Sequence, residues 1–186
     1  TPKLLQDNAA SYHFSLIVCP SVMRGGAPVS STRIRTCISN GEVSKVNEYL
    51  GYPFTINGIV IHGQKRGRRL GFPTANLALR EEFEHLPNGV YAATVFYQDH
   101  LYYAASNVGN NPTFDACDRR LEVHIMGFSG DLYGAEIMVS FYKKIRNERH
   151  FPSAEALIQQ IEKDKESVVC VLAENFHLQE NISMVI

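Results

Sequence analysis

The chain has 186 residues, of which 45% are hydrophobic and 20% charged, values typical of a folded globular protein rather than a disordered one. This length accommodates one ordinary domain and a remnant of another, whereas two full domains would be cramped. A formal net charge of −1 argues against broad nucleic-acid or anionic-membrane binding, which would need a clear excess of Lys and Arg.

The cysteine pattern and the amino end of the chain indicate in which cellular compartment the protein is expected. Four scattered cysteines form no CxxC pair and no Cys/His cluster with metal-ligand spacing. No run of about 18 apolar residues is present, and the amino end lacks the basic-then-apolar pattern of a signal peptide. A cytoplasmic location is therefore expected. The first residue is Thr rather than Met, which indicates a fragment, although a processed protein would begin in the same way.

The amino-terminal part predicts one strand and two helices. Residues 13–19 (HFSLIVC) form an apolar run consistent with a buried strand. Residues 30–32 (SST) can cap a short helix that follows them. A second helix is expected over residues 42–50, because Gly51 follows as a stop signal.

Beyond this part the hydrophobic period shortens to that of β-strands. Turn chemistry separates the apolar runs, with PNG before the second run, QDH after it and GD before the last. Five or more antiparallel strands suggest a barrel or a sandwich, because closure removes exposed edges. The strands are expected over residues 54–61, 90–97, 101–107, 121–126 and 136–142.

The last long element is predicted to be a helix with Ser153 as its cap. Its apolar residues recur at spacings of three and four, and the resulting stripe is expected to pack on the barrel. The stripe consists of Ala154, Leu157, Ile158, Ile161, Val168, Val169 and Leu172.

The segment 62–77 (HGQKRGRRLGFPTANL) carries the densest chemical signal. Gly63, Gly67 and Gly71 recur every four residues among basic side chains, which suits a flexible loop whose amides and cations approach phosphate. The spacing matches neither GxxxxGK[ST] nor GxGxxG, so neither motif's mechanism applies. A solvated basic hairpin is the alternative for this stretch alone.

Two oxygen donors follow this loop. Because Pro73 disfavours helical backbone in the residue before it, Thr74 and Asn76 should project to the same side of an extended chain. A hydroxyl and an amide carbonyl are hard oxygen ligands of the kind that Mg²⁺ accepts. The alternative is that these two side chains only satisfy a turn.

Glu122 lies within the strand pattern LEVHIM. Alternation puts Leu121 and Val123 on one face of the strand, and Glu122 with His124 on the other. A carboxylate in this position is either solvated or aimed at a site, and the periodicity alone favours solvent.

Several motifs together resemble one family. The segment GFPTAN is similar to the GxPTAN signature of the riboflavin kinase family, and HGQKRGR resembles that family's glycine-rich phosphate flap. The resemblance covers about residues 53–175. Further segments match in order and approximate spacing: NVGNNPTF (107–114), LEVH (121–124), DLYG (131–134) and RNERHF (146–151).

The resemblance implies a mainly β fold, a six-stranded antiparallel Greek-key barrel with a C-terminal α-helix, which agrees with the independent strand pattern. It implies transfer of the γ-phosphate of ATP to the 5′-hydroxyl of riboflavin, giving FMN, with Mg²⁺ accompanying ATP. In this family pattern Glu122 is the catalytic base, and Thr74 and Asn76 are the metal ligands.

The resemblance also implies two sets of binding residues. Nucleotide contacts are expected from Gly63, Lys65, Arg66, Gly67, Arg68, Gly71, Pro73, Thr74 and His124. Flavin contacts are expected from Asn107, Gly109, Pro112, Thr113, Phe114, Arg146, Arg149 and Phe151. Either of the two arginines could equally be an ordinary surface residue.

The segment VSSTRIR (29–35) resembles a motif near the end of the FMN adenylyltransferase module in bacterial bifunctional FAD synthetases. The first half of that module, with its ATP-binding histidine motif, has no counterpart here. We therefore expect residues 1–40 to be a remnant of that module, residues 41–52 a helical linker and residues 53–186 the riboflavin kinase domain. The parent polypeptide is expected to contain the adenylyltransferase module, and this chain alone is not expected to make FAD.

The sequence leaves two other functional classes open. One is a non-catalytic flavin-binding barrel, and the intact Thr74, Asn76 and Glu122 argue against it. The other is a protein-interaction barrel, which requires that neither flavin nor nucleotide binds. The expected partners are the small molecules riboflavin and ATP, with neither nucleic acid nor membrane.

Overall fold

Residues 2–78, 86–113 and 116–183 are described by the computed structural model. They fall into two units, Thr1–Ser31 and Thr32–Ile186. The larger unit contains every candidate site residue.

The smaller unit contains a short helix and a small hairpin. The helix is α1 (Pro2–Asn8), and the hairpin pairs β1 (Met23–Arg24) with β2 (Ala27–Pro28). Gly25 and Gly26 form the turn with φ angles of +58° and +75°. A two-residue hairpin turn with positive φ at both positions is the conformation that glycine adopts at no steric cost.

The prediction of a buried strand over residues 13–19 is wrong. These residues belong to no strand, none of them is buried, and Ile17 is 86% exposed. An apolar run becomes a buried strand only when a neighbouring strand completes its hydrogen bonds and another layer covers its side chains. The described residues of this unit supply neither.

Two helices precede the barrel, and both were predicted. They are α2 (Ser31–Ser39) and α3 (Val43–Leu50). The helix α3 ends where Gly51 adopts a φ of +80° and donates its N–H to the carbonyl oxygen of Asn47 at 2.8 Å. The Asn47 side chain donates to the carbonyl oxygen of Phe141 at 2.8 Å, which ties α3 to the barrel.

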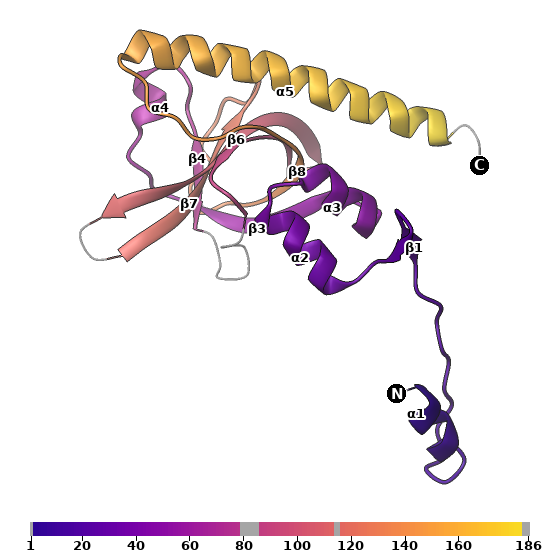
Figure 1. Ribbon diagram of the computed structural model, residues 1–186. Helices are drawn as coiled ribbons and strands as arrows, with labels where there is room; N and C mark the ends of the chain where they lie inside the picture. The colour runs from indigo at the N-terminus through magenta and orange to yellow at the C-terminus, as the bar shows by residue number, and fades with distance from the viewer. Residues whose placement is uncertain (1, 79–85, 114–115, 184–186) are drawn as a thin grey trace. The chain divides into compact units, whose positions relative to one another are not determined.

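Six antiparallel strands close a barrel in the described part of the chain (Figure 1). Their order is β3-β4-β7-β6-β5-β8, and β8 pairs back with β3. Since β5, β6 and β7 follow one another and β8 returns beside β5, the arrangement is a Greek key. The predicted fold class is confirmed. The strands are β3 (Phe54–Ile61), β4 (Ala75–Ala78), β5 (Gly89–Tyr97), β6 (His100–Thr113), β7 (Ala116–Ile125) and β8 (Glu136–Arg146).

All five predicted strands are present, but β6, β7 and β8 are longer than the sequence pattern indicated. Their extensions are mostly polar, so the apolar alternation fades before the hydrogen-bonded ladder ends. The strand β4 was missed, because its four residues ANLA include a single large apolar side chain. Its pairing with β3 and β7 stabilises it, and a local pattern does not show this pairing.

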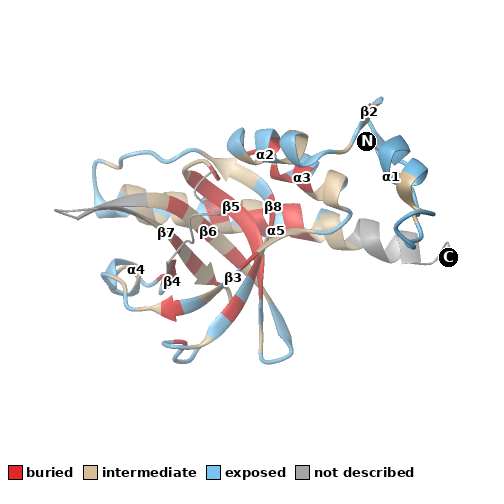
Figure 2. Ribbon diagram, turned by 90° about the horizontal axis from the view of Figure 1, so that it is seen from below, coloured by how far each residue is buried: buried red, intermediate tan, exposed pale blue. Residues whose placement is uncertain are grey.

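Buried strand residues form the core of the barrel, and Figure 2 shows them in red along the strands. Among the largest fully buried side chains are Ile56, Leu77, Tyr91, Leu121 and Phe141, which come from five different strands. This interior cluster fixes which face of each strand points into the barrel, and a second cluster lies between the outer face and α5, formed by Ala92, Tyr142, Val168, Val171 and Leu172.

The helix α5 (Ala154–Ser183) lies across the outside of the barrel and contacts β5, β6 and β8 (Figure 1). Its predicted cap is present, since the N–H of Ala156 donates to Oγ of Ser153 at 3.2 Å. Of the predicted stripe, Val168 and Leu172 are fully buried, whereas Val169 is 46% exposed. One helix on a convex barrel buries a narrow band, so residues at the edge of the stripe stay exposed. No described helix is long and apolar enough to cross a membrane.

Candidate active site

Three polar residues form one row across the outer face of the barrel. Asn76 of β4 pairs with Glu122 of β7, and Glu122 pairs in turn with Asn107 of β6. Directly paired residues of neighbouring strands point to the same face. Leu121 and Val123, on either side of Glu122, are fully buried inside the barrel, so the row faces outward. The fold thus brings together a predicted metal ligand, the predicted base and a predicted flavin contact.

Glu122 is half-buried in this row. Burial raises the pKa of its carboxyl group above the ordinary value, and the Glu148 carboxylate raises it further. The guanidinium groups of Arg66 and Arg120 lower it. Burial is the largest of these influences, so the carboxylate is a stronger proton acceptor than a solvated one, as a general base requires. The influence of Arg66 also places the basic segment close to Glu122.

That basic segment contains one helical turn, α4 (Arg66–Arg69). Lys65 enters the turn with a φ of +55°, and the N–H of Phe72 closes it on the carbonyl oxygen of Gly67 at 2.8 Å. A Cβ at position 67 would lie 2.3 Å from the carbonyl oxygen of Phe72, so this close approach requires glycine. The segment is therefore a tightly folded flap, whereas the sequence predicted a flexible loop.

Thr74 and Asn76 fit a magnesium site. The backbone at Gly63 lies directly over Asn76, because a Cβ at position 63 would be 2.3 to 2.6 Å from three atoms of the Asn76 side chain. Asn76 is only 5% exposed, so its amide is held in place. Mg²⁺ prefers a few hard oxygen ligands and completes its shell with phosphates and water. Among the described residues no group of three or more His, Cys, Asp or Glu could hold a metal ion.

A cavity of about 290 Å³ opens beside Thr74. Lys65 and Arg68 bring positive charge to it from the flap. Such a pocket suits a nucleotide. Its apolar wall can contact the ring faces of the base, and its cationic groups can bind the anionic phosphates. The apolar wall includes Val60, Val123, Ile125, Phe128 and Leu132.

The segment 128–133 forms one side of this cavity. Its Tyr133 ring contacts the His62 ring with 3.9 Å between centroids and a tilt of 33°, and the Lys65 ammonium lies 5.9 Å from the Tyr133 ring centre. These contacts join the flap to the opposite wall. The sequence predicted no binding role for this segment, although its DLYG matched the family pattern. Its composition includes no residue pattern typical of phosphate or nucleobase binding.

His124 contacts the segment that follows the flap. Its Nδ1 lies 2.9 Å from the carbonyl oxygen of Pro73, and the Phe72 ring meets the His124 ring edge-on at 5.6 Å. The Lys165 ammonium of α5 lies 5.3 Å from the Phe72 ring centre. In the structure His124 therefore positions the segment before Thr74, and a direct nucleotide contact stays a prediction.

The predicted flavin residues gather at the neighbouring end of β6 and in the loop after β8. Pro112 and Thr113 belong to β6, and Phe114 lies outside the described residues. Arg149 is exposed in the loop. Phe151 is half-buried, with the guanidinium of Arg146 5.6 Å from its ring centre.

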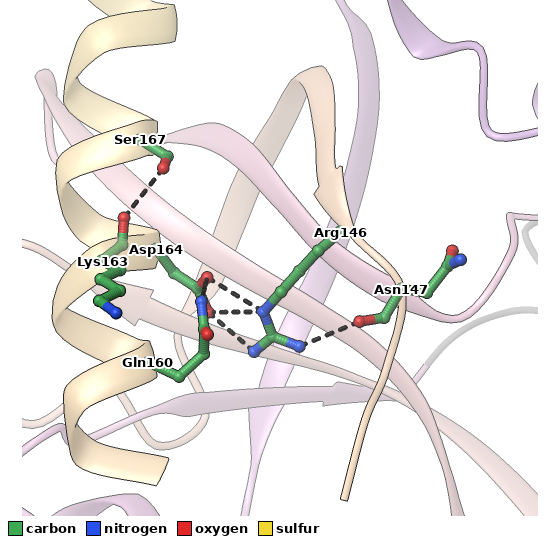
Figure 3. A network of polar contacts seen from close by, with 6 residues as sticks. All are labelled: Arg146, Asn147, Gln160, Lys163, Asp164 and Ser167. Atoms are coloured by element: carbon green, nitrogen blue, oxygen red, sulfur yellow. Dashed lines mark hydrogen bonds and ion pairs between the residues drawn. The ribbon is translucent and has the colours of Figure 1, made fainter. Parts of the chain in front are cut away.

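Arg146 is engaged in a buried ion pair that joins β8 to α5 (Figure 3). Its Nε donates to both carboxylate oxygens of Asp164 at 3.0 Å, and its Nη2 donates to Oδ2 at 2.8 Å. The side chain of Gln160 also donates to Asp164, which is 4% exposed. Arg146 thus anchors the start of the loop after β8, and a flavin contact by this residue stays a prediction.

The riboflavin kinase family model matches residues 50–172. The chain belongs to the riboflavin kinase family. The match agrees with the GFPTAN segment, the outward Glu122 and the closed barrel described above.

Curated relatives carry the same assignment. The bifunctional riboflavin kinase/FMN adenylyltransferase of Bacillus subtilis is 43% identical over 146 residues, which cover 76% of this chain and 46% of the relative. The protein of the same name from Escherichia coli is 37% identical over 163 residues, covering 87% of this chain and 52% of the relative. The chain spans about half the length of the curated relatives it matches.

Two solved structures are similar to this riboflavin kinase family member. A chain named as a macrolide-efflux protein from Streptococcus pneumoniae has a TM-score of 0.81 and 37% identity, covering 90% of this chain and 54% of its own. A riboflavin kinase from Trypanosoma brucei has a TM-score of 0.51 and 26% identity, covering 65% and 80%. The two names differ, and the family assignment rests on the family model and the curated relatives.

Proposed function

We propose that this chain transfers the γ-phosphate of ATP to the 5′-hydroxyl of riboflavin and releases FMN and ADP. The observation that carries this function is the outward row of Asn76, Glu122 and Asn107 in a member of the riboflavin kinase family. A cavity with cationic groups opens at Thr74, two residues before Asn76. Neither the site nor the comparisons favour a non-catalytic flavin-binding barrel.

Phosphoryl transfer depends mainly on positioning and on neutralising charge. In this proposal the nucleotide binds in the cavity that Lys65 and Arg68 line, and these two cations neutralise its phosphates. Bound Mg²⁺, with Thr74 and Asn76 as its protein ligands, supplies further neutralisation of phosphate charge. The closed turn of the flap keeps its amides and cations fixed over the cavity, so little reorganisation is needed when the nucleotide binds.

Glu122 orients the 5′-hydroxyl of riboflavin and accepts its proton as the oxygen bonds to phosphorus. Its raised pKa keeps this acceptor basic. Asn107 lies next to it in the row and can donate an amide hydrogen bond to the substrate or to the carboxylate.

The product of the reaction tests this function. Incubation of the purified chain with riboflavin, ATP and Mg²⁺ should give FMN and no detectable FAD, because the kinase motifs are complete and the nucleotide-binding half of the adenylyltransferase module is not in this chain. Chromatography separates the two flavins. FAD formation would contradict the domain assignment, and the absence of FMN would contradict the kinase function.

The metal site makes a second test. Thr74→Ala and Asn76→Ala should each weaken Mg-ATP binding by at least about tenfold. Removal of a residue that only hydrogen-bonds to a metal ligand already lowers metal affinity by about that factor. ATP binding without Mg²⁺ should change little. Nucleotide titrations with and without Mg²⁺ measure the difference, and equal losses under both conditions would remove the case for metal ligation.

The two substitutions differ in their structural cost. Asn76 lies in β4 and is buried, whereas Thr74 precedes the strand. Asn76→Ala therefore lowers the stability more than Thr74→Ala, and thermal unfolding of both variants should accompany the titrations. Thr74→Ser keeps the hydroxyl and serves as the matched control, with most of the metal-dependent affinity retained.

The longer relatives suggest what accompanies this domain. We infer that residues 1–40 derive from the end of an FMN adenylyltransferase module, that residues 41–52 link it to the kinase domain, and that the parent polypeptide carries the rest of that module in the cytoplasm. The chain's coverage of about half of each relative, 46% and 52%, supports this inference. An antibody against the barrel should detect, in the cytosolic fraction, a polypeptide about twice as long as this chain.

A further inference from the structure

Glu148, in the loop after β8, occupies the space that Gly109 leaves open. A Cβ at Gly109 would lie 2.4 Å from Oε1 of Glu148 and 3.5 Å from Nδ2 of Asn107. Residues two apart in a strand point to the same face, so Gly109 is the next outward position of β6 after Asn107. The Glu148 carboxylate therefore extends the row of Glu122 and Asn107 by one position.

A chain of hydrogen bonds holds this carboxylate in place. The side chain of Asn88 donates to Oε2 of Glu148 at 3.0 Å. Nη2 of Arg119 donates to Oδ1 of Asn88 at 3.0 Å and also to the carbonyl oxygen of Leu86. Within the described residues Oε1 of Glu148 receives no hydrogen bond. One carboxylate oxygen is thus held by the protein, and the other lies against Gly109 and keeps its capacity to accept a hydrogen bond.

The spacing between Glu122 and the Gly109 position, against which the Glu148 carboxylate lies, suits a short polyol. Glu122 pairs directly with Asn107, which makes Gly109 its diagonal neighbour, and diagonal neighbours across two strands lie about 7–8 Å apart. The flavin substrate carries a five-carbon side chain with hydroxyls on consecutive carbons between the ring and the terminal 5′-hydroxyl. Such a chain can reach one carboxylate with its terminal hydroxyl and the other with a secondary hydroxyl.

We propose that Glu148 is a second substrate-binding carboxylate, which accepts a hydrogen bond from a secondary hydroxyl of the ribityl chain while Glu122 engages the terminal hydroxyl. This inference rests on the proposed kinase function. Holding the chain at two points restricts its rotation and places the reacting oxygen against Glu122, which is how positioning lowers a barrier. Glu148 also makes the site select flavins with a polyol side chain over flavins with a plain alkyl chain.

A purely structural role for Glu148 predicts a different result. If the carboxylate only ties the loop to Asn88, its removal loosens the site for every flavin alike. A substrate analogue that keeps the terminal hydroxyl but lacks the secondary ones separates the two roles. The analogue with a 5-hydroxypentyl group at N10 in place of ribityl has this property.

The test measures dissociation constants of riboflavin and this analogue from flavin fluorescence, for the wild-type chain, Glu148→Ala and Glu148→Gln. Glu148→Ala should weaken riboflavin binding by about 10- to 100-fold, the range for a hydrogen bond to a charged group. The analogue should bind the wild-type chain more weakly than riboflavin and should be almost unaffected by the substitution. Glu148→Gln keeps a neutral hydrogen-bond acceptor, so its dissociation constant for riboflavin should lie between those of the wild-type chain and Glu148→Ala.

Glu136→Ala is the matched control, because it removes an exposed carboxylate at the opposite end of β8. It should leave both dissociation constants unchanged. Equal weakening of riboflavin and the analogue by Glu148→Ala, or no weakening of either, overturns the inference. If Glu148→Ala does not fold, the same comparison with Glu148→Gln decides. If the wild-type chain makes FMN but the Glu148 variants do not discriminate between riboflavin and the analogue, only the role of Glu148 is overturned. If the wild-type chain binds neither flavin, the kinase function is overturned as well.

Discussion

Glu122→Gln should lower kcat by about two to four orders of magnitude, the usual contribution of a general base. Glutamine has nearly the same size as glutamate and still forms hydrogen bonds, but it cannot accept the proton of the 5′-hydroxyl. Asn76 and Asn107, which flank Glu122 in the row, should keep the substituted side chain in place. The affinities for riboflavin and ATP should therefore change little, which is the pattern of an interaction made in the transition state.

Steady-state kinetics together with separate binding titrations measure these two effects. Glu136→Gln changes an exposed carboxylate of the same barrel and should have wild-type kcat. A folded Glu122→Gln protein with near-normal turnover would exclude Glu122 as the base. The hydroxyl would then have to be activated by the metal or by water.

The barrel could be predicted from the sequence because the local alternation of apolar residues identifies most of its strands. In the pattern LEVHIM, alternate burial of Leu121 and Val123 follows from a period of two, and the structure confirms it. The end of α3 at Gly51 follows equally from local chemistry. The strand β4 and the apolar run 13–19 could not be assigned correctly, because in each case the outcome depends on whether a distant partner strand is present.

The site shows the same division between local and distant information. The family pattern identified Glu122 and Asn76 separately, but their adjacency depends on the register between β4 and β7. The neighbouring position of Asn107 depends likewise on the register between β6 and β7. Glu148 had no signal of its own, since its place in the row arises from a loop that folds over Gly109.

Asp164→Ala should lower the free energy of unfolding by about 3–5 kcal/mol, the cost of breaking a buried ion pair by removing one partner. The side chains of Arg146 and Asp164 are only 14% and 5% exposed. The substitution therefore leaves a guanidinium with little access to water, and it also removes the acceptor of Gln160. Chemical denaturation of the wild-type and variant chains measures the difference.

Glu162→Ala is the matched control for this loss, because it breaks an ion pair of the same helix in which Glu162 is 52% exposed and Lys165 30%. Exposed pairs contribute about 0–1 kcal/mol, so its effect should be small. The double substitution Arg146→Met with Asp164→Leu should recover much of the stability, since well-packed apolar residues can replace a buried pair. If Asp164→Ala costs no more than Glu162→Ala, the ion pair does not anchor α5. Because Arg146 also begins the loop that carries Glu148, a true loss of the anchor should weaken riboflavin binding even where the chain remains folded.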